Sequence, residues 1–264
     1  MALALQLPKR MLSASWHGAN RRISAVIPGS ALARQYRHAT FANIYEKELW
    51  GPAAGGKYFS GTGSIGEMAN TYVRAMAPVL AESARRLGAG VTIVDLGCGD
   101  FRVGSALLAA LPEIRYVGCD IVADLIAQNN LRHGSERISF RCLDMVTDPL
   151  PPGDIFLVRQ VLQHLSNRDI ESVLNKLRNR PYVFITEGQP SSLAGPINPD
   201  MPAGAGVRYD WKSGTGRGVE LDKPPYNCHI EEICRAYSDP AISKDAVITY
   251  RISPARKKGQ GDGD

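Results

Sequence analysis

The 264-residue sequence lacks several features that mark common protein classes. Its five cysteines include no Cys-x-x-Cys pair, which argues against a disulfide framework and against a structural metal site. No apolar run approaches the ~18 residues that a membrane-spanning helix needs. No acidic residue precedes Glu46, and the sequence contains no internal repeat. We therefore expect a reduced, globular protein that binds no metal and does not span a membrane.

The basic character of the chain is concentrated at its N-terminal end. The net charge is +5, and six basic residues precede Glu46: Lys9, Arg10, Arg21, Arg22, Arg34 and Arg37. The rest of the chain is therefore close to neutral, and its bulk charge gives no reason to expect a nucleic-acid partner. Residues 1–40, rich in Ala, Ser and Arg, have the composition of a disordered arm, an over-extended translation start or an organelle-targeting peptide. We expect this extension to lie outside the folded domain, in a cytoplasmic protein or, if the source is eukaryotic, an organelle-targeted one.

The most informative segment is residues 91–104, with the sequence VTIVDLGCGDFRVG. An apolar run ends at Asp95 and is followed by two glycines and a segment expected to be helical, which is typical of a turn that approaches a nucleotide-like ligand. A dinucleotide-binding turn has Gly or Ala at its sixth position, because the helix packs closely against the strand there. This chain has Arg102 at that position. The turn therefore favours a ligand that has no pyrophosphate.

Two further acidic residues follow apolar segments. Asp120 comes after residues 115–119, and Asp144 with Met145 comes after residues 138–143. A carboxylate at the end of the second strand suits ribose hydroxyls, since it can accept two hydrogen bonds. The alternative is that these acids are ordinary turn residues. Three acids in this order, each after an expected strand, favour a common ligand site.

The hydrophobic pattern predicts alternating strands and helices along most of the chain. Expected strands cover residues 91–96, 115–119, 137–142, 154–158 and 182–186; expected helices cover 66–87, 102–111, 121–132 and 167–178. Pro78 predicts a kink or a break in the first helix. Residues 231–238 and 246–252 are interpreted as an antiparallel hairpin, and the tail 254–264 as disordered. This order predicts a mostly parallel sheet with helices on both faces.

Together these segments resemble the class I S-adenosyl-L-methionine-dependent methyltransferases. Longer blocks resemble one bacterial family of that class, most of whose members have no assigned substrate: residues 41–45, 50–51, 60–64, 98–101, 120–126, 143–150, 159–166 and 221–227. The resemblance implies an α/β fold, the Rossmann-like class I methyltransferase three-layer sandwich with an antiparallel C-terminal hairpin. It also implies one domain over residues 41–253, in which residues 41–88 form N-terminal lid helices.

The resemblance implies S-adenosyl-L-methionine as the cofactor. The residues expected to bind it are Trp50, Ser64, Asp95, Gly97, Cys98, Gly99, Asp120, Ile121, Asp144, Met145 and Gln160. Within this set, Trp50 or the nearby Tyr45 would cover the sulfonium. The hydroxyl groups of residues 60–64 would suit the methionine carboxylate.

His164 and Glu187 are the candidate catalytic residues, because each follows an expected strand end and can act as a base. The alternatives are a structural histidine and a turn acid. The fourth strand lacks the Asn/Asp-Pro-Pro-aromatic element of many amino-group and nucleic-acid methyltransferases, which favours oxygen or carbon as the acceptor atom. The long loop 188–227 is expected to contact the acceptor.

We therefore expect methyl transfer to a small-molecule or glycan-like hydroxyl. The alternatives are a protein or RNA methyltransferase recruited through the basic N-terminal arm, and a binding module without catalysis. The oligomeric state is not indicated by the sequence.

Overall fold

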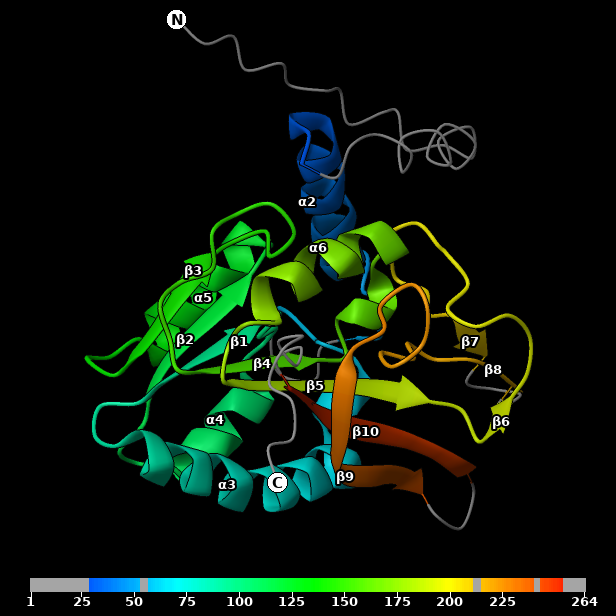
Figure 1. Ribbon diagram of the computed structural model, residues 1–264. Helices are drawn as coiled ribbons and strands as arrows, with labels where there is room; N and C mark the ends of the chain where they lie inside the picture. Colours follow the sequence, from blue (N-terminus) through cyan, green and yellow to red (C-terminus); the bar gives the residue numbers. More distant parts are fainter. Residues whose placement is uncertain (1–28, 53–56, 211–214, 240–242, 254–264) are drawn as a thin grey trace, which may run out of the picture.

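The computed structural model describes residues 29–52, 57–210, 215–239 and 243–253 (Figure 1). The expectations for residues 1–28 and for the tail 254–264 lie outside the described residues. None of the helices in this described part is long and apolar enough to cross a membrane.

A seven-stranded sheet forms the centre of the molecule, in the order β3-β2-β1-β4-β5-β10-β9. The strands are β1 Thr92–Leu96, β2 Arg115–Asp120, β3 Ile138–Cys142, β4 Ile155–Arg159, β5 Tyr182–Gln189, β9 His229–Asp239 and β10 Ser243–Ser253. The first five strands are parallel, whereas β10 pairs antiparallel with both β5 and β9. The mostly parallel sheet and its C-terminal hairpin confirm the predicted architecture.

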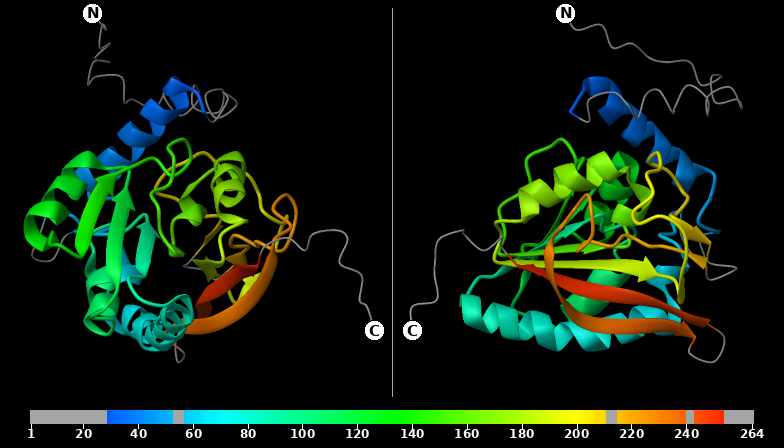
Figure 2. Two further views of the ribbon diagram at one scale, coloured as in Figure 1. Left: turned by 60° about the vertical axis from the view of Figure 1, so that its left-hand side comes forward. Right: turned by 45° about the vertical axis from the view of Figure 1, so that its right-hand side comes forward.

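Helices cover both faces of this sheet (Figures 1 and 2). Along β1 the side chains alternate between two apolar clusters: Ile93 packs with residues of α3 (Gly66–Leu87), and Val94 packs with residues of α6 (Asn167–Leu177). Helix α4 (Arg102–Ala109) lies on the α3 side and α5 (Ala123–His133) packs beside β2 and β3. The result is the expected three-layer sandwich.

Helix α3 runs through Pro78 without interruption, so the predicted alternative of a break at this residue is wrong. Proline removes one backbone N–H from the helix and disfavours the preceding turn. Met76 and Leu80, on either side of the proline, have no exposed surface and pack into the cluster beneath the sheet. This burial holds the helix in one piece.

Helix α2 (Ala31–Glu46) corrects the expected domain boundary between residues 40 and 41. Its N-cap is Ser30, whose Oγ accepts a hydrogen bond from the Ala33 N–H at 3.2 Å. One face of the helix is buried through Ala33, Arg37, Phe41, Ile44 and Tyr45. Residues 31–40 are therefore part of the folded domain, because the apolar face of α2 begins before residue 41.

The order of the strands reverses between β1 and β4, where the chain crosses from one half of the sheet to the other. In open α/β sheets, ligands bind beyond the carboxyl ends of the strands at such a switch point. The long connection between β5 and β9 covers part of this edge and contains a small three-stranded sheet, β6 (Ser192–Leu193), β7 (Tyr209–Asp210) and β8 (Thr215–Gly216). The fold thus places the predicted strand-end residues in one region.

Candidate active site

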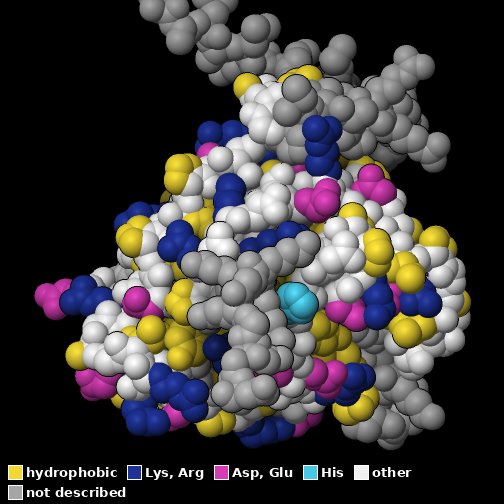
Figure 3. All heavy atoms as spheres, viewed as in Figure 1, with side chains coloured by type: hydrophobic (Ala, Val, Ile, Leu, Met, Phe, Trp, Pro, Cys, Tyr) yellow, Lys and Arg dark blue, Asp and Glu magenta, His cyan; other side chains and the backbone are white. Residues whose placement is uncertain are grey.

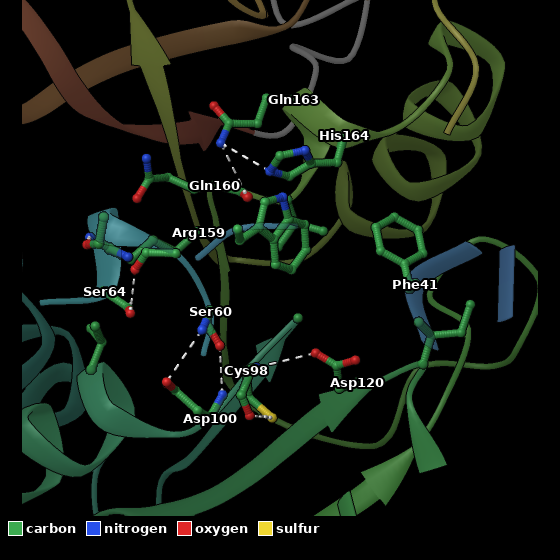
Figure 4. A pocket seen from close by; sticks show the side chains of 18 of the residues that line it. Phe41, Ser60, Ser64, Cys98, Asp100, Asp120, Arg159, Gln160, Gln163 and His164 are labelled. Atoms are coloured by element: carbon green, nitrogen blue, oxygen red, sulfur yellow. Dashed lines mark hydrogen bonds between the residues drawn. The ribbon is translucent and has the colours of Figure 1, made fainter. Parts of the chain in front are cut away.

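A cavity of about 570 Å³ opens at this switch point. All eleven residues predicted to bind the cofactor line it: Trp50, Ser64, Asp95, Gly97, Cys98, Gly99, Asp120, Ile121, Asp144, Met145 and Gln160. Figure 4 shows Asp120 and Cys98 at one end, and Gln160, Gln163 and His164 at the opposite end. The cavity is therefore one continuous space with an acidic end and an uncharged end.

The glycine turn after β1 uses its backbone N–H groups internally. The N–H groups of Gly97 and Cys98 donate to the Cys119 carbonyl at 2.7 and 3.0 Å, and Gly99 N–H donates to Asp120 Oδ2 at 3.2 Å. A phosphate-binding turn needs N–H groups that are free to point at the anion. This turn therefore suits a ligand without phosphates, in agreement with Arg102 at its sixth position.

Close approach explains why glycine occupies two positions of this turn. Gly97 and Gly99 have φ of +81° and +53°, in the left-handed region. A Cβ atom on Gly97 would lie 2.3 Å from Cγ2 of Val161, and one on Gly99 would lie 2.2 Å from Oγ of Ser60. The turn thus packs closely against both the segment after β4 and the loop before α3.

Asp120 ends β2 with its carboxylate at the cavity wall. Its Oδ2 accepts from Gly99 N–H and its Oδ1 accepts from Val122 N–H at 3.1 Å. Burial raises the pKa of Asp120 to about 6, against the opposing effect of these backbone donors. Each oxygen retains a second lone pair, so the carboxylate can still accept hydrogen bonds from a pair of hydroxyl groups.

Asp95, in β1, accepts a hydrogen bond from a residue of the neighbouring strand β2. The Tyr116 hydroxyl donates to its Oδ2 at 2.6 Å, and burial raises the pKa of Asp95 to about 6. Its other oxygen accepts no hydrogen bond from the described residues. Asp95 therefore presents one free carboxylate oxygen toward the cavity that it lines.

Asp144 forms a buried ion pair that the sequence did not indicate. Arg37 of α2 donates to Asp144 Oδ2 from Nη2 at 2.7 Å and to Asp169 Oδ1 from Nη1 at 3.1 Å. The side chains of Arg37 and Asp144 are 3% and 1% exposed, so this is a desolvated network. Composition alone places Arg37 in the basic extension, although the helical spacing of Arg37, Phe41, Ile44 and Tyr45 is a signal for a buried position. Helix α2 is thereby attached directly to a residue that lines the cavity, Asp144.

Trp50 joins the segment before α3 to the long loop after β5. Its indole Nε1 donates to the Ala205 carbonyl at 3.2 Å, and its ring contacts the rings of Tyr45 and His164 at centroid distances of 5.4 and 5.0 Å. Ala205 and its neighbour Gly206 line the cavity, as expected for this loop. Residues 211–214 of this loop, which include Trp211, lie outside the described residues.

The Ser60 and Ser64 hydroxyl groups of the 60–64 loop are engaged within the protein. Ser64 Oγ donates to the Gly61 carbonyl at 2.7 Å, and Ser60 Oγ accepts from Asp100 N–H at 2.8 Å. The cation beside this loop is Arg159, whose Nη2 donates to the Gly63 carbonyl at 2.5 Å. Arg159 was not among the residues predicted for the site, although a charged residue at the end of an apolar strand is a signal that could have found it.

His164 lies on the cavity wall, in the short helix η2 (Leu162–His164). Its Nδ1 is 3.0 Å from the Gly206 carbonyl oxygen, so this nitrogen carries the proton and donates. Its Nε2 therefore accepts from the Gln163 side-chain amide at 3.3 Å. Burial lowers the pKa of His164 to about 4, which makes it a weak proton acceptor.

Glu187 does not line the cavity, which corrects the expectation that it acts on the acceptor. It lies within β5 rather than beyond it, has no exposed surface and pairs across the sheet with Ile248. Its carboxylate accepts from three consecutive backbone N–H groups of residues 161–163, at 3.2, 2.9 and 3.1 Å. Glu187 therefore holds the segment that carries Gln163 and His164, because β5 continues past the predicted strand end.

No group of three or more His, Cys, Asp or Glu side chains in the described ranges is arranged to hold a metal ion. The charged side chains among the described residues that line the cavity are Arg37, Asp95, Asp100, Asp120, Asp144 and Arg159. The site has glycines where the backbone approaches the cavity, carboxylates at the strand ends and no free N–H group in the turn. These features fit a nucleoside with an amino-acid tail better than a nucleotide.

Comparison with known proteins agrees with this geometry. Residues 94–180 match the family described as a methyltransferase domain. Juvenile hormone acid O-methyltransferase of Bombyx mori is 41% identical over 61 residues, 22% of each chain. Trans-resveratrol di-O-methyltransferase of Vitis vinifera is 26% identical over 142 residues, 52% of this chain and 37% of that protein. The matches thus span only about a fifth and about a third of these relatives.

The fold is also found among solved structures. The N-methyltransferase NodS of Bradyrhizobium japonicum, in complex with S-adenosyl-L-homocysteine, superposes with a TM-score of 0.51 at 15% identity, covering 82% of this chain and 100% of that one. The narrower bacterial family stays a prediction. Residues 94–180 thus resemble a methyltransferase domain, and the chain has the Rossmann-like fold of class I methyltransferases.

Proposed function

We propose that this chain transfers the methyl group of S-adenosyl-L-methionine to a small, largely apolar acceptor, at an oxygen atom. When bound, the cofactor supplies an activated methyl group. Asp120 would accept the ribose hydroxyls, Asp144 and Met145 would flank the adenine, and Gln160 would face the methionine end. The observation that carries the proposal is the continuity of the cavity, which joins the three strand-end acids to an uncharged end.

The uncharged end favours an apolar acceptor. It is lined by Trp50, Val161, Leu165 and the backbone around Ala205, together with the polar but neutral Gln163. Apolar walls with a few polar groups are typical of small-molecule sites. Both curated relatives are named as O-methyltransferases, which supports oxygen as the acceptor atom.

Gln163 supports an acceptor that carries a hydrogen-bond donor. Its amide nitrogen faces two acceptors, Nε2 of His164 at 3.3 Å and the Gln160 carbonyl at 3.5 Å, which sets the orientation of the amide. Its Oε1 is then buried without a partner among the described residues. An acceptor hydroxyl would satisfy this oxygen, and His164 would act as a positioning residue for Gln163 rather than as a base.

A protein or RNA acceptor recruited through the basic arm is less well supported. Of the six basic residues before Glu46, Arg34 and Arg37 are engaged in ion pairs with acids of the domain. On the face seen in Figure 3, basic and acidic side chains are interspersed. Neither observation favours a polyanionic partner.

The test is methyl transfer from radiolabelled S-adenosyl-L-methionine to a panel of phenols, aliphatic alcohols, sugars, carboxylic acids and amines. We expect label in a hydroxyl compound with an apolar body, and no transfer by Asp120→Ala. Label found only in amines, or only in protein or RNA added to the assay, would reject the proposed acceptor class.

A further inference from the structure

Arg208, in the long loop after β5, lies behind the cavity wall and uses all of its N–H groups within the protein. It does not line the cavity, and a guanidinium carries five N–H donors. Its five acceptors are the carbonyl oxygens of Leu162, Gln163, Leu165 and Pro199, at 3.3, 3.2, 2.6 and 3.1 Å, and Oδ1 of Asn167 at 2.9 Å. Three of these acceptors belong to segment 161–165, which contains η2. Arg208 is therefore committed mainly to one short piece of backbone.

Glu187 holds the same segment through the opposite polar groups. Arg208 donates to carbonyl groups of segment 161–165, whereas the Glu187 carboxylate accepts from three of its N–H groups. Burial raises the pKa of Glu187 to about 7 and lowers that of Arg208, and each charge opposes this effect on the other. Segment 161–165 thus lies between an anion and a cation, each placed on the matching groups of its backbone.

Segment 161–165 carries the polar side chains at the uncharged end of the cavity. Gln163 and His164 both line the cavity, and Figure 4 shows them side by side there. Gln163, whose Oε1 would accept from the acceptor hydroxyl, has its own N–H bonded to Glu187 and its own carbonyl bonded to Arg208. A shift of this residue's backbone would therefore move the oxygen that receives the acceptor.

Arg208 also fixes a second part of the wall, residues 205–207, which line the cavity. On the N-terminal side of these residues, the Gly204 N–H donates to the His164 carbonyl at 3.0 Å. On their C-terminal side, Arg208 itself bonds to segment 161–165. The wall residues are therefore fastened at both ends to the segment that carries the polar side chains.

We propose that Arg208 is a positioning residue for methyl transfer, which holds Gln163 and the wall 205–207 in one arrangement and thereby sets the place of the acceptor. The inference rests on the proposed function, which assigns this end of the cavity to the acceptor. Arg208 bonds to none of the residues expected to bind the cofactor. Its loss should therefore impair use of the acceptor and leave cofactor binding intact.

The test compares Arg208→Met with the wild type, each as the full chain, with 2-naphthol as the hydroxyl probe and S-adenosyl-L-homocysteine as the cofactor probe. We expect kcat/KM for 2-naphthol to fall about 10- to 100-fold, because misplacement of a bound reactant by about 1 Å has an effect of that size. Affinity for S-adenosyl-L-homocysteine, measured by calorimetry, should change by less than about 3-fold, since sites that share no partner are nearly independent. Arg208→Lys should recover only part of the loss, because an ammonium group has three donors for five acceptors.

Hydrogen exchange measured by mass spectrometry, with S-adenosyl-L-homocysteine bound, reports the positioning without any acceptor. In Arg208→Met we expect faster exchange in peptides that cover residues 161–165 and 204–208, because the hydrogen bonds that join these two segments are lost. Exchange in β1 and β2 should stay as in the wild type.

Arg217→Met is the matched control. Arg217 lies in the same connection between β5 and β9, donates to the Gly195 carbonyl at 3.1 Å and pairs with Glu220 at 2.9 Å. It does not line the cavity, and its hydrogen bonds in the described structure do not reach segment 161–165. We expect it to leave turnover of 2-naphthol, cofactor affinity and the exchange of both segments unchanged.

Unchanged exchange of residues 161–165 and 204–208 in Arg208→Met would overturn the inference. Equal losses of acceptor turnover and cofactor affinity would also overturn it, because they would indicate a general structural role. If Arg208→Met does not fold, Arg208→Lys decides: wild-type exchange and wild-type kcat/KM in that variant contradict the inference.

The proposed function fails separately. If the wild type labels another hydroxyl compound of the panel but not 2-naphthol, that compound replaces it as the probe. If the wild type labels no hydroxyl compound, the proposed function is rejected, whereas hydrogen exchange still decides whether Arg208 holds the two segments together.

Discussion

Replacement of Arg37 by methionine should destabilise the protein far more than its place near the N-terminus suggests. The change removes the cation that pairs with Asp144 and Asp169 and leaves two acids in a region where the Asp144 side chain is 1% exposed. Removing one partner of a buried ion pair costs about 3–5 kcal/mol. The control on the same helix is Arg34→Met, whose partner is Asp148 and whose side chain is 48% exposed; we expect about 0–1 kcal/mol there.

Urea unfolding followed by circular dichroism measures both losses, and its pH dependence tests the cause. Burial already raises the pKa of Asp169, and Arg37 opposes that rise. Without Arg37, the pKa of Asp169 in the folded state rises further above its value in the unfolded state. The destabilisation is therefore full above the folded-state pKa, and it shrinks as the pH falls toward the unfolded-state pKa. Equal losses in the two variants, or a loss of Arg37→Met that grows at low pH, would refute this account of α2.

Three further predictions concern the cavity. Cofactor affinity, measured by calorimetry, should be constant above pH 7 and fall below about pH 6. Burial raises the pKa of Asp95 and Asp120 to about 6, and their protonation removes the hydrogen-bond acceptors. A flat profile from pH 5 to 8 would contradict this. Glu187→Gln should lower the free energy of unfolding in urea at pH 8 by about 1–3 kcal/mol. The reason is that the amide NH₂ would face the three backbone N–H donors of residues 161–163. Unchanged stability would contradict these hydrogen bonds. Gly97→Ala should lower the free energy of unfolding by about 1–2 kcal/mol because of its left-handed backbone, and by a further amount because the new Cβ clashes with Val161. Val161→Ala should therefore recover part of that loss in the double variant. Strictly additive losses would argue against the contact.

The cavity end formed by the first three strands could be predicted because its geometry follows from the order of the chain. Parallel strands bring their carboxyl ends to one edge, so acids that each follow an apolar run must lie close together. Asp95, Asp120 and Asp144 all line the cavity for this reason. The glycines could be predicted from the turn itself, since a short connection from strand to helix requires positive φ.

The remaining features depend on contacts between distant parts of the chain. Whether Glu187 is a turn acid or a buried one depends on β10, which extends β5 by pairing with it some 60 residues later in the sequence. The helical spacing of buried positions in α2 was present in the sequence, but its buried arginine resembled a basic tail until Asp144 and Asp169 supplied the partners. Polar residues that act through distant partners are therefore the ones that sequence patterns miss.

Calorimetric titration of the full chain with S-adenosyl-L-methionine, alongside Asp120→Ala, tests the central claim most directly. The account predicts one binding site per chain and a marked loss of affinity in the variant, whose unfolding by urea should confirm that it is folded. Absence of binding by the wild type, or equal binding by the wild type and the variant, would contradict it.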